Sequence, residues 1–324
     1  MAAITVLMPV YNGMPYLPEA VHSILSQTFR DFVYLIINDG STDGSEEYLN
    51  GLDDPRVRVV HRPHCGTGAT LNVGLEMCQT EFLARMDADD LSLPGRLEAQ
   101  LGFLGSRPEV GMAGTQFAYF GARGHSVLSR RVPRDHQTIY QDLLRGQMSF
   151  VHASLMCRSS ILKGIGGYRI QGAGEDWDMF LRMGETTQLA NIDECLYFWR
   201  IHLANARVSH LTQAYLGVDY ARHCAKRRAE NLPETTLDDF VRQRRARPFW
   251  QRTADAVDLY SLAQYRSALA EIANGRQGRG YSHLAWAALC SPRRTSRRLS
   301  RAFRKPRKST LSLPTKHAPE RIGK

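Results

Sequence analysis

Arg85-Met86-Asp87-Ala88-Asp89-Asp90 is the stretch from which the architecture of this chain can be predicted, because it joins an apolar run to a helical pattern. Phe82-Leu83-Ala84 comes before it and is typical of the end of a short buried strand. Leu93-Pro94 comes after it and indicates the first turn of a helix over 94–105. Three carboxylates therefore lie on a turn where a strand ends, which is where open α/β sheets bind ligands.

The carboxylates of this turn have two interpretations. Asp87 and Asp89 are two residues apart in an extended turn, so they could point the same way and share a divalent cation with a phosphate-bearing ligand. Mg²⁺ is often held in this way, by one or two carboxylates together with phosphates. The alternative is that the aspartates only cap the helix that follows, which is a common use of Asp.

Strands and helices alternate in the first part of the chain. Apolar runs predict strands over 4–8, 32–37, 57–60 and 82–84. Helical spacing predicts the first of the intervening helices over 15–28. Pro9 cannot donate to a sheet ladder, so we expect the first strand to end there. The alternation predicts an α/β fold with a doubly wound, mostly parallel sheet. Neither GxGxxG nor GxxxxGKS/T occurs, so dinucleotide-binding and P-loop folds are not favoured.

Three polar side chains follow the first two predicted strands. Tyr11 and Asn12 come after the first strand, and an aromatic face next to an amide suits a nucleobase. Asp39 comes after the second strand, where a carboxylate can accept hydrogen bonds from a base or a ribose. Ordinary turns also use residues of these types.

The second part of the chain has a less regular pattern. We expect a strand over 110–120, irregular structure over 121–135 and another strand over 196–201, which leads to His202. Glu175-Asp176 stands at the start of a predicted helix, where stabilisation of the helix dipole is the simplest explanation for two carboxylates. From about residue 207 onward the pattern is helical up to the C-terminal tail.

Length and charge divide the chain into three predicted regions. The 324 residues suffice for one large or two small domains. Residues 291–324 contain 12 Lys or Arg and one Glu, a net charge of +11, so the rest of the chain carries −1 of the total of +10. We expect a catalytic domain over 1–205, a helical region over 206–290 and a disordered basic tail over 291–324.

Signals for membrane insertion, secretion and metal-binding cysteines are missing from the sequence. No run of about 18 apolar residues occurs, so no transmembrane helix is expected. No basic region precedes the apolar run at Ile4, which argues against a signal peptide. The 6 cysteines form no CxxC pair and no zinc spacing, and we expect reduced thiols in a cytoplasmic protein.

A set of separate motifs resembles glycosyltransferase family 2, the inverting enzymes of the GT-A fold. The motifs are Pro9-Val10-Tyr11-Asn12, Asn38-Asp39-Gly40-Ser41-Thr42-Asp43, Leu71-Asn72-Val73-Gly74, Ala84-Arg85-Met86-Asp87-Ala88-Asp89-Asp90, Gly166-Gly167-Tyr168, Gly174-Glu175-Asp176 and Trp199-Arg200-Ile201-His202. They occur in the family's order and span roughly residues 4–205. The resemblance implies a GT-A-type sheet, followed here by a C-terminal helical extension.

The resemblance assigns the donor side of the site. The residues that look like the family's pocket for the nucleotide base and ribose are Pro9, Tyr11, Asn12 and Asp39. Asp87 looks like the first Asp of the family's DxD motif, near the ribose and the metal. Asp89 looks like the residue that holds Mg²⁺ or Mn²⁺ on the diphosphate.

The resemblance also implies a general base, and at one position this chain departs from the family's pattern. Asp176 looks like the general base of the family's Glu-Asp motif. His202 matches a position that binds the metal or the diphosphate in some relatives, and a structural role is an equal alternative. Many relatives carry Arg where this chain has Leu71, a position associated with base contacts. Arg85 could compensate for that loss.

These features favour a metal-dependent inverting glycosyltransferase of cell-surface polysaccharide synthesis. It would move a sugar from a nucleotide-sugar, a UDP-sugar in the first instance, to a hydroxyl of a glycan or lipid-linked acceptor. A cation would neutralise the leaving diphosphate, and a carboxylate would take the proton of the attacking hydroxyl. A nucleotidyltransferase is the alternative enzyme, but Asn12-Gly13-Met14-Pro15 is not the basic glycine-rich loop that it would favour.

The basic tail has three interpretations. With the apolar residues of the helix predicted over 279–290, it would place the enzyme on the cytoplasmic face of an anionic membrane. Nucleic-acid binding would use the same cations, but it is less favoured because the rest of the chain is near neutral. A solvated tail that only aids solubility is the third interpretation.

Overall fold

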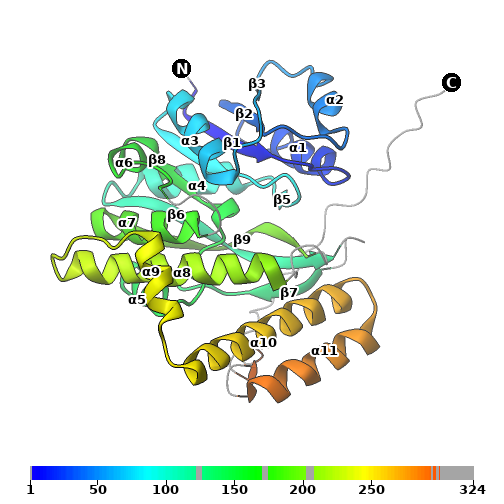
Figure 1. Ribbon diagram of the computed structural model, residues 1–324. Coiled ribbons are helices and arrows are strands. Elements are labelled where there is room, and N and C mark those ends of the chain that lie inside the picture. The colour runs from blue at the N-terminus through cyan, green and yellow to red at the C-terminus, as the bar shows by residue number, and fades with distance from the viewer. Residues whose placement is uncertain are drawn as a thin grey trace.

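The computed structural model describes residues 2–121, 126–169, 174–201, 208–292, 295–296 and 299, and nine strands within these residues form one sheet. The strand order is β3-β2-β1-β4-β8-β6-β9-β5, and β7 pairs with β6 outside this row. Figure 1 shows the sheet with its helices, and the last two helices lie at the end of the molecule away from β1–β3. The expected α/β fold with a C-terminal helical extension is confirmed.

The first part of the chain forms the parallel part of the sheet. Its strands are β1 (Ile4–Val10), β2 (Phe32–Asn38), β3 (Val57–His61) and β4 (Phe82–Arg85). The helices that connect them are α1 (Leu17–Leu25), α2 (Ser45–Asn50) and α3 (Thr67–Met77). Because parallel neighbours run in the same direction, the carboxyl ends of β1, β2 and β4 meet at one edge of the sheet.

Beyond β4 the sheet is mixed rather than mostly parallel. The remaining strands are β5 (Leu91–Ser92), β6 (Val110–Gly121), β7 (Ser126–Arg130), β8 (Met156–Arg158) and β9 (Gln188–Ile201). β8 runs antiparallel to both β4 and β6, whereas β9 runs parallel to β6. The alternation of strand and helix that predicts a parallel sheet extends only as far as β4.

One strand occurs where the sequence predicts irregular structure, and another begins earlier than expected. β7 lies within 121–135 and runs antiparallel to β6. Pairing with β6 supplies its hydrogen bonds, which a charged sequence does not predict by itself. β9 begins at Gln188 rather than near 196 because it follows β6 along most of the length of that strand.

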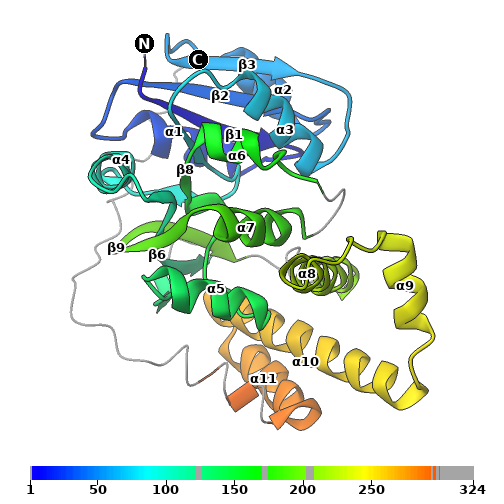
Figure 2. The same cartoon turned by 90° about the vertical axis from the view of Figure 1, so that its left-hand side faces the viewer.

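The other helices cover the sheet and extend from it. They are α4 (Arg96–Gly105), α5 (His136–Leu144), the short 3-10 helix η1 (His152–Ser154), α6 (Ser159–Gly164), α7 (Glu175–Thr186), α8 (Val208–Ala229), α9 (Leu237–Arg245), α10 (Phe249–Ala273) and α11 (Gln277–Cys290). α8 packs against α7, and α10 and α11 form a hairpin (Figure 2). The predicted domain boundary at 205 falls within 202–207, outside the described residues. None of the described helices combines the length and the apolar character needed to cross a bilayer.

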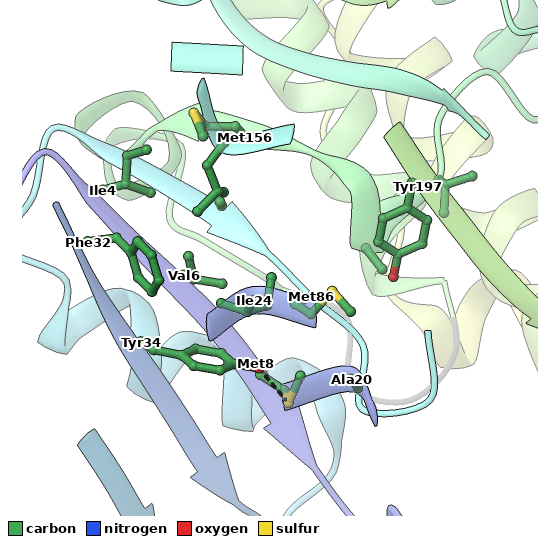
Figure 3. Packing of buried hydrophobic residues seen from close by; sticks show 14 of the residues in the cluster. Ile4, Val6, Met8, Ala20, Ile24, Phe32, Tyr34, Met86, Met156 and Tyr197 are labelled. Carbon is green, nitrogen blue, oxygen red and sulfur yellow. Dashed lines mark hydrogen bonds between the residues drawn. The ribbon is translucent and has the colours of Figure 1, made fainter. Parts of the chain in front are cut away.

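The core lies on both faces of the sheet. Successive side chains of a strand point to opposite faces, so Ile4, Val6 and Met8 join one apolar cluster while Leu7 joins the other. Figure 3 shows the first cluster, in which α1 contributes Ile24. Burial on both faces explains why β1 and β2 are continuous apolar runs rather than alternating ones.

β1 passes through Pro9 instead of ending there, and it continues to Val10. The Leu7 carbonyl accepts from Met86 N–H at 3.0 Å, and the Val10 carbonyl accepts from Asp39 N–H at 2.8 Å. Backbone groups point to alternate sides along a strand, so the Pro9 nitrogen faces the β4 side. β4 has already ended at that level, and the missing donor therefore costs no ladder hydrogen bond.

Candidate active site

Three carboxylates converge on the turn after β4. Asp87, Asp89 and Asp90 each offer one oxygen, and these oxygens lie within 4.8 Å of one another. Asp90 is buried, and its burial, together with the charges of Asp89 and Asp87, raises its pKa well above the ordinary value. A divalent cation would relieve the repulsion within this aspartate turn, and carboxylate oxygens are the ligands that such cations prefer.

Asp90 holds the end of β9 against the aspartate turn. Tyr197 Oη donates to Asp90 Oδ2 at 2.7 Å, and Arg200 N–H donates to Asp90 Oδ1 at 2.7 Å. Arg200 Nε also donates to the Asp89 carbonyl at 2.7 Å, and its guanidinium forms an ion pair with Glu19 of α1. Both oxygens of Asp90 are thus engaged by β9. Tyr197 and Glu19 lie in no motif, so the sequence alone does not assign them to the site.

Arg85 is the last residue of β4 and directly precedes the aspartate turn. Its side chain is buried and forms an ion pair with Asp87. Its Nε has no hydrogen-bond partner among the described residues. The sequence suggests Arg85 as a replacement for the base-contacting arginine that this chain lacks. In the structure, the Arg85 side chain is already engaged by Asp87. Leu71, at the position of that arginine, is fully buried in the core.

The Asp39 carboxylate is held by the loop before α3. Cys65 N–H and Gly66 N–H donate to it at 3.0 and 2.9 Å, and His64 Nδ1 lies 2.9 Å from Asp39 Oδ2. Burial acts to raise the pKa of Asp39, but hydrogen bonds from Cys65, Thr70 and Gly66 outweigh it and lower that pKa. The carboxylate is therefore ionised at neutral pH.

A stacked aromatic pair accompanies Asp39. The Tyr11 ring lies on the His64 imidazole, with centroids 4.1 Å apart and an interplanar angle of 27°. Gly40 permits the close approach of the loop, because its φ is +74° and a Cβ there would lie 2.9 Å from His64 N. Both rings are partly exposed to solvent. His64 is a residue of the site that the sequence analysis misses, since it lies in a loop without a motif.

Asn12 ties the loop after β1 to the loop after β2. Thr42 N–H donates to Asn12 Oδ1 at 2.8 Å, and Asn12 N–H donates to Ser41 Oγ at 3.0 Å. These bonds connect the segment that carries Tyr11 to the segment that carries Asp39. The predicted donor-side residues therefore come together at the carboxyl ends of β1 and β2, with Asn12 ordering the loop.

Glu175 and Asp176 begin α7, as the sequence predicts. Trp177 N–H donates to Asp176 Oδ1 at 2.7 Å. Burial raises the pKa of Asp176, against the opposing effects of this hydrogen bond and of the Arg85 charge. Glu175 Oε2 is buried and finds no hydrogen-bond partner in the described part of the chain. Burial and the Asp176 charge raise the pKa of Glu175 to about 8.

Two further motifs, 96 positions apart in the chain, contact each other in the structure. Asn72 Nδ2 donates to the Tyr168 carbonyl at 2.7 Å, and Tyr168 N–H donates to Asn72 Oδ1 at 2.9 Å. Gly167 has a φ of +61°, and a Cβ there would lie 2.5 Å from Asn72 Oδ1. Tyr168 Oη lies 2.9 Å from His152 Nε2. These motifs are thus explained by a contact between α3 and the turn after α6.

His202 falls within 202–207, outside the described residues, so its role as a metal ligand stays a prediction. Most of the basic tail also falls outside the described residues. The roles of the residues in the aspartate turn and at the start of α7 likewise stay predictions, although the structure places each of them as described above.

Comparisons with known proteins agree with this arrangement. Residues 5–166 match the family model described as Glycosyl transferase family 2. The chain is 31% identical over 216 residues to the O-antigen biosynthesis glycosyltransferase WbnJ of Escherichia coli, and the match covers 64% of this chain and 83% of WbnJ. The chain belongs to glycosyltransferase family 2.

This family 2 glycosyltransferase shares its fold with solved structures. S. aureus TarS 1-349 in complex with UDP-GlcNAc gives a TM-score of 0.53 at 15% identity, over 90% of this chain and 92% of TarS 1-349. The mannosyltransferase PcManGT from Pyrobaculum calidifontis, in complex with GDP-Man and Mn²⁺, gives a TM-score of 0.52 at 15% identity, over 92% of this chain and 79% of PcManGT. At these identities the likeness concerns the fold alone.

Proposed function

We propose that this glycosyltransferase moves a sugar from a UDP-sugar to a hydroxyl of a glycan or lipid-linked acceptor in cell-surface polysaccharide synthesis. The observation that carries the proposal is the convergence of Asp87, Asp89 and Asp90 after β4. This aspartate turn lies at the same sheet edge as the Tyr11 and Asp39 loops. TarS, which was solved with UDP-GlcNAc, and WbnJ, which is named for O-antigen biosynthesis, support the donor and the product class.

Mg²⁺ or Mn²⁺ is the proposed cofactor, held by Asp89 and Asp87 with His202 as a further ligand. The donor set fits, because hard cations prefer carboxylate oxygens. Asp90 is already engaged by β9 and would orient the turn. PcManGT, which was solved with Mn²⁺, supports the choice. When bound, the cation would neutralise charge on the leaving diphosphate.

The nucleotide would lie over the loops after β1 and β2. The exposed rings of Tyr11 and His64 offer a surface for stacking of the base. Asp39 is ionised and would accept from base or ribose donors. Pro9 and Asn12 would shape this pocket through the backbone, Pro9 in β1 and Asn12 by its bonds to the neighbouring loop.

Asp176 is the proposed general base. The acceptor oxygen would bond to the anomeric carbon while the bond from that carbon to the diphosphate breaks, and the hydroxyl proton would pass to Asp176. One such displacement inverts the anomeric configuration. Trp177 N–H fixes one oxygen of Asp176 and leaves the other for the hydroxyl. The Arg85 charge favours ionised Asp176, and we propose this role for Arg85 in place of a base contact.

We also propose that the enzyme works at the cytoplasmic face of a membrane, where a lipid-linked acceptor would be presented. The support is the net charge of +11 on residues 291–324. Anionic lipid attracts such segments by about 1 kcal/mol per basic residue near the surface. In this proposal residues 1–205 form the catalytic domain, residues 206–290 the helical region and residues 291–324 the basic tail.

A panel of nucleotide-sugars assayed for nucleotide release tests the catalytic proposal. We expect UDP release from a UDP-sugar with Mn²⁺, and loss of release in EDTA. Asp89→Ala should abolish transfer with an unchanged melting temperature, because Asp89 would hold the metal rather than the core. Full activity in EDTA or in Asp89→Ala would contradict the metal assignment. Pyrophosphate release from a nucleoside triphosphate would favour a nucleotidyltransferase instead.

A further inference from the structure

The α10–α11 hairpin is packed through small residues. Gly280 lies so close to α10 that a Cβ there would be 2.4 Å from the Ile272 side chain. Ser261 Oγ donates to the Ala287 carbonyl at 2.9 Å, and Ala268 and Ala287 are fully buried. The two helices therefore approach each other closely at small residues, with Gly280 against the Ile272 side chain.

Several large apolar side chains of the hairpin face solvent. Five of them are 57% to 74% exposed: Phe249, Trp250, Tyr281, Trp286 and Leu289. Helices of water-soluble proteins normally turn such residues toward the core. Here α11 is the outer helix of the pair (Figure 2), and Tyr281 and Leu289 are eight residues apart, about two turns, so they share one side of it. Exposed apolar patches of this kind mark interaction sites.

The charges of the hairpin match an anionic partner. Two of its acidic residues form ion pairs, Asp255 with Arg244 at 3.1 Å and Glu271 with Arg276 at 3.5 Å. Asp258 accepts from Ser291 Oγ at 3.1 Å. Arg252 and Arg279 are exposed. α11 then leads directly into residues 291–324, which carry a net charge of +11.

We propose that the outer face of the α10–α11 hairpin inserts into the headgroup region of an anionic membrane. Trp250, Trp286 and Leu289 would enter the interface, where aromatic side chains are favoured. The basic segment that follows α11 in the sequence would add charge attraction to the lipid phosphates. A second copy of the chain is a less suitable partner for this face. Dimerisation through it would bring together two strongly basic segments, which repel each other. This inference rests on the proposed lipid-linked acceptor and names the surface that would bring the enzyme to it.

Tryptophan quenching by brominated lipids tests the insertion on the full chain. The chain has 4 Trp, of which Trp250 and Trp286 are exposed on the hairpin, whereas Trp177 is buried in the body. With vesicles of phosphatidylcholine and phosphatidylglycerol, we expect quenching that Trp250→Phe/Trp286→Phe removes. Persistent quenching in this double variant, or none in the unmodified chain, would overturn the proposal.

Vesicle partitioning of surface variants provides the second measurement. Trp286→Ser/Leu289→Ser should lower the partition coefficient by at least about tenfold, because both side chains would leave the apolar interface. Leu232→Ser is the matched control, since Leu232 is also exposed but lies outside the hairpin, and it should bind as the unmodified chain does. Equal partitioning of all three proteins would overturn the proposal. A concentration-dependent dimer that Trp286→Ser/Leu289→Ser dissolves, without vesicle binding, would assign the face to self-association.

Nucleotide release in solution separates this inference from the catalytic proposal. Trp286→Ser/Leu289→Ser should release UDP from a UDP-sugar at the rate of the unmodified chain, because the hairpin would act only in membrane binding. Loss of vesicle binding with intact release supports the inference. A release rate that falls together with binding would overturn the purely membrane-binding role. Failure of the unmodified chain to release any nucleotide would count against the proposed function alone, since the quenching result stands without turnover.

Discussion

At the scale of single residues, the surroundings of each carboxylate suit it to a different task. Backbone donors keep Asp39 ionised. Donors from β9 engage both oxygens of Asp90. The buried Oε2 of Glu175 has no hydrogen-bond partner among the described residues, and burial together with the Asp176 charge raises the pKa of Glu175 to about 8. In the proposed site, chemically similar groups would therefore bind a nucleotide, orient a turn or hold a proton.

Asp176→Asn should lower kcat by at least about 100-fold, the lower range for loss of a general base, because an amide does not take the hydroxyl proton. Nucleotide affinity by calorimetry and the melting temperature should stay unchanged, since the side chain keeps its size. The wild-type rate should fall as pH drops through the raised pKa of Asp176, because the protonated carboxyl cannot act as a base. The residual rate of Asp176→Asn should not show this fall at low pH.

Asp31→Asn is the matched control for this substitution, because Asp31 is an exposed carboxylate that precedes β2. It should leave the rate and its pH dependence unchanged. If nucleotide affinity collapsed together with the rate in Asp176→Asn, Asp176 would be a binding residue rather than the base.

At the scale of elements, a few polar contacts join segments that are far apart in the chain. Tyr197 and Asp90 are 107 positions apart and connect β9 to the aspartate turn. Arg200 extends this connection to α1 through Glu19. The geometry of the proposed metal site therefore depends on β9 as well as on β4.

Tyr197→Phe should lower the free energy of unfolding by about 1–3 kcal/mol, because buried Asp90 would lose a donor. The KM for the donor should rise as well, since the aspartate turn would be less well held. Urea denaturation and initial-rate kinetics measure the two effects. Tyr34→Phe is the matched control: Tyr34 is equally buried, but within the described residues its hydroxyl donates to the weak acceptor Met8 Sδ, at 3.3 Å. Equal stability losses in the two variants would contradict the role of the Asp90 contact.

At the scale of the whole molecule, the proposed catalytic and membrane-binding parts occupy different ends. The parallel strands β1, β2 and β4 carry the site at their carboxyl ends. The α10–α11 hairpin lies at the end of the molecule away from β1–β3 (Figure 1). Changes in the C-terminal region should therefore alter membrane binding more than turnover in solution.

A chain that ends at Pro292 should bind anionic vesicles at least about tenfold more weakly than the full chain at low salt, because each basic residue near the surface adds about 1 kcal/mol. Added salt should weaken binding of the full chain more than that of the shortened chain, since screening acts on the charges and not on apolar insertion. Co-sedimentation with and without anionic lipid measures both. Equal, weak binding by both chains would remove the role of the tail.

Local sequence patterns are sufficient to predict the first four strands and the positions of several candidate site residues. β1, β2 and β4 follow from continuous apolar runs, because burial on both faces of a sheet requires them. The positions of Asp87, Asp89 and Asp176, at the end of a strand or the start of a helix, could be predicted from local motifs, and their roles stay predictions. Local spacing is sufficient for such positions, since each depends on one element and its turn.

Other features depend on contacts between segments that are far apart in the chain. The antiparallel strands beyond β4, the passage of β1 through Pro9 and the pairing of β7 depend on which strand lies alongside, and local sequence does not specify that neighbour. His64, Tyr197 and Glu19 belong to the site only because distant segments fold against it. The exposed side of α11 likewise depends on the small residues that face α10. Each of these features arises from contacts between segments far apart in the chain, and a pattern within one segment cannot encode its partner.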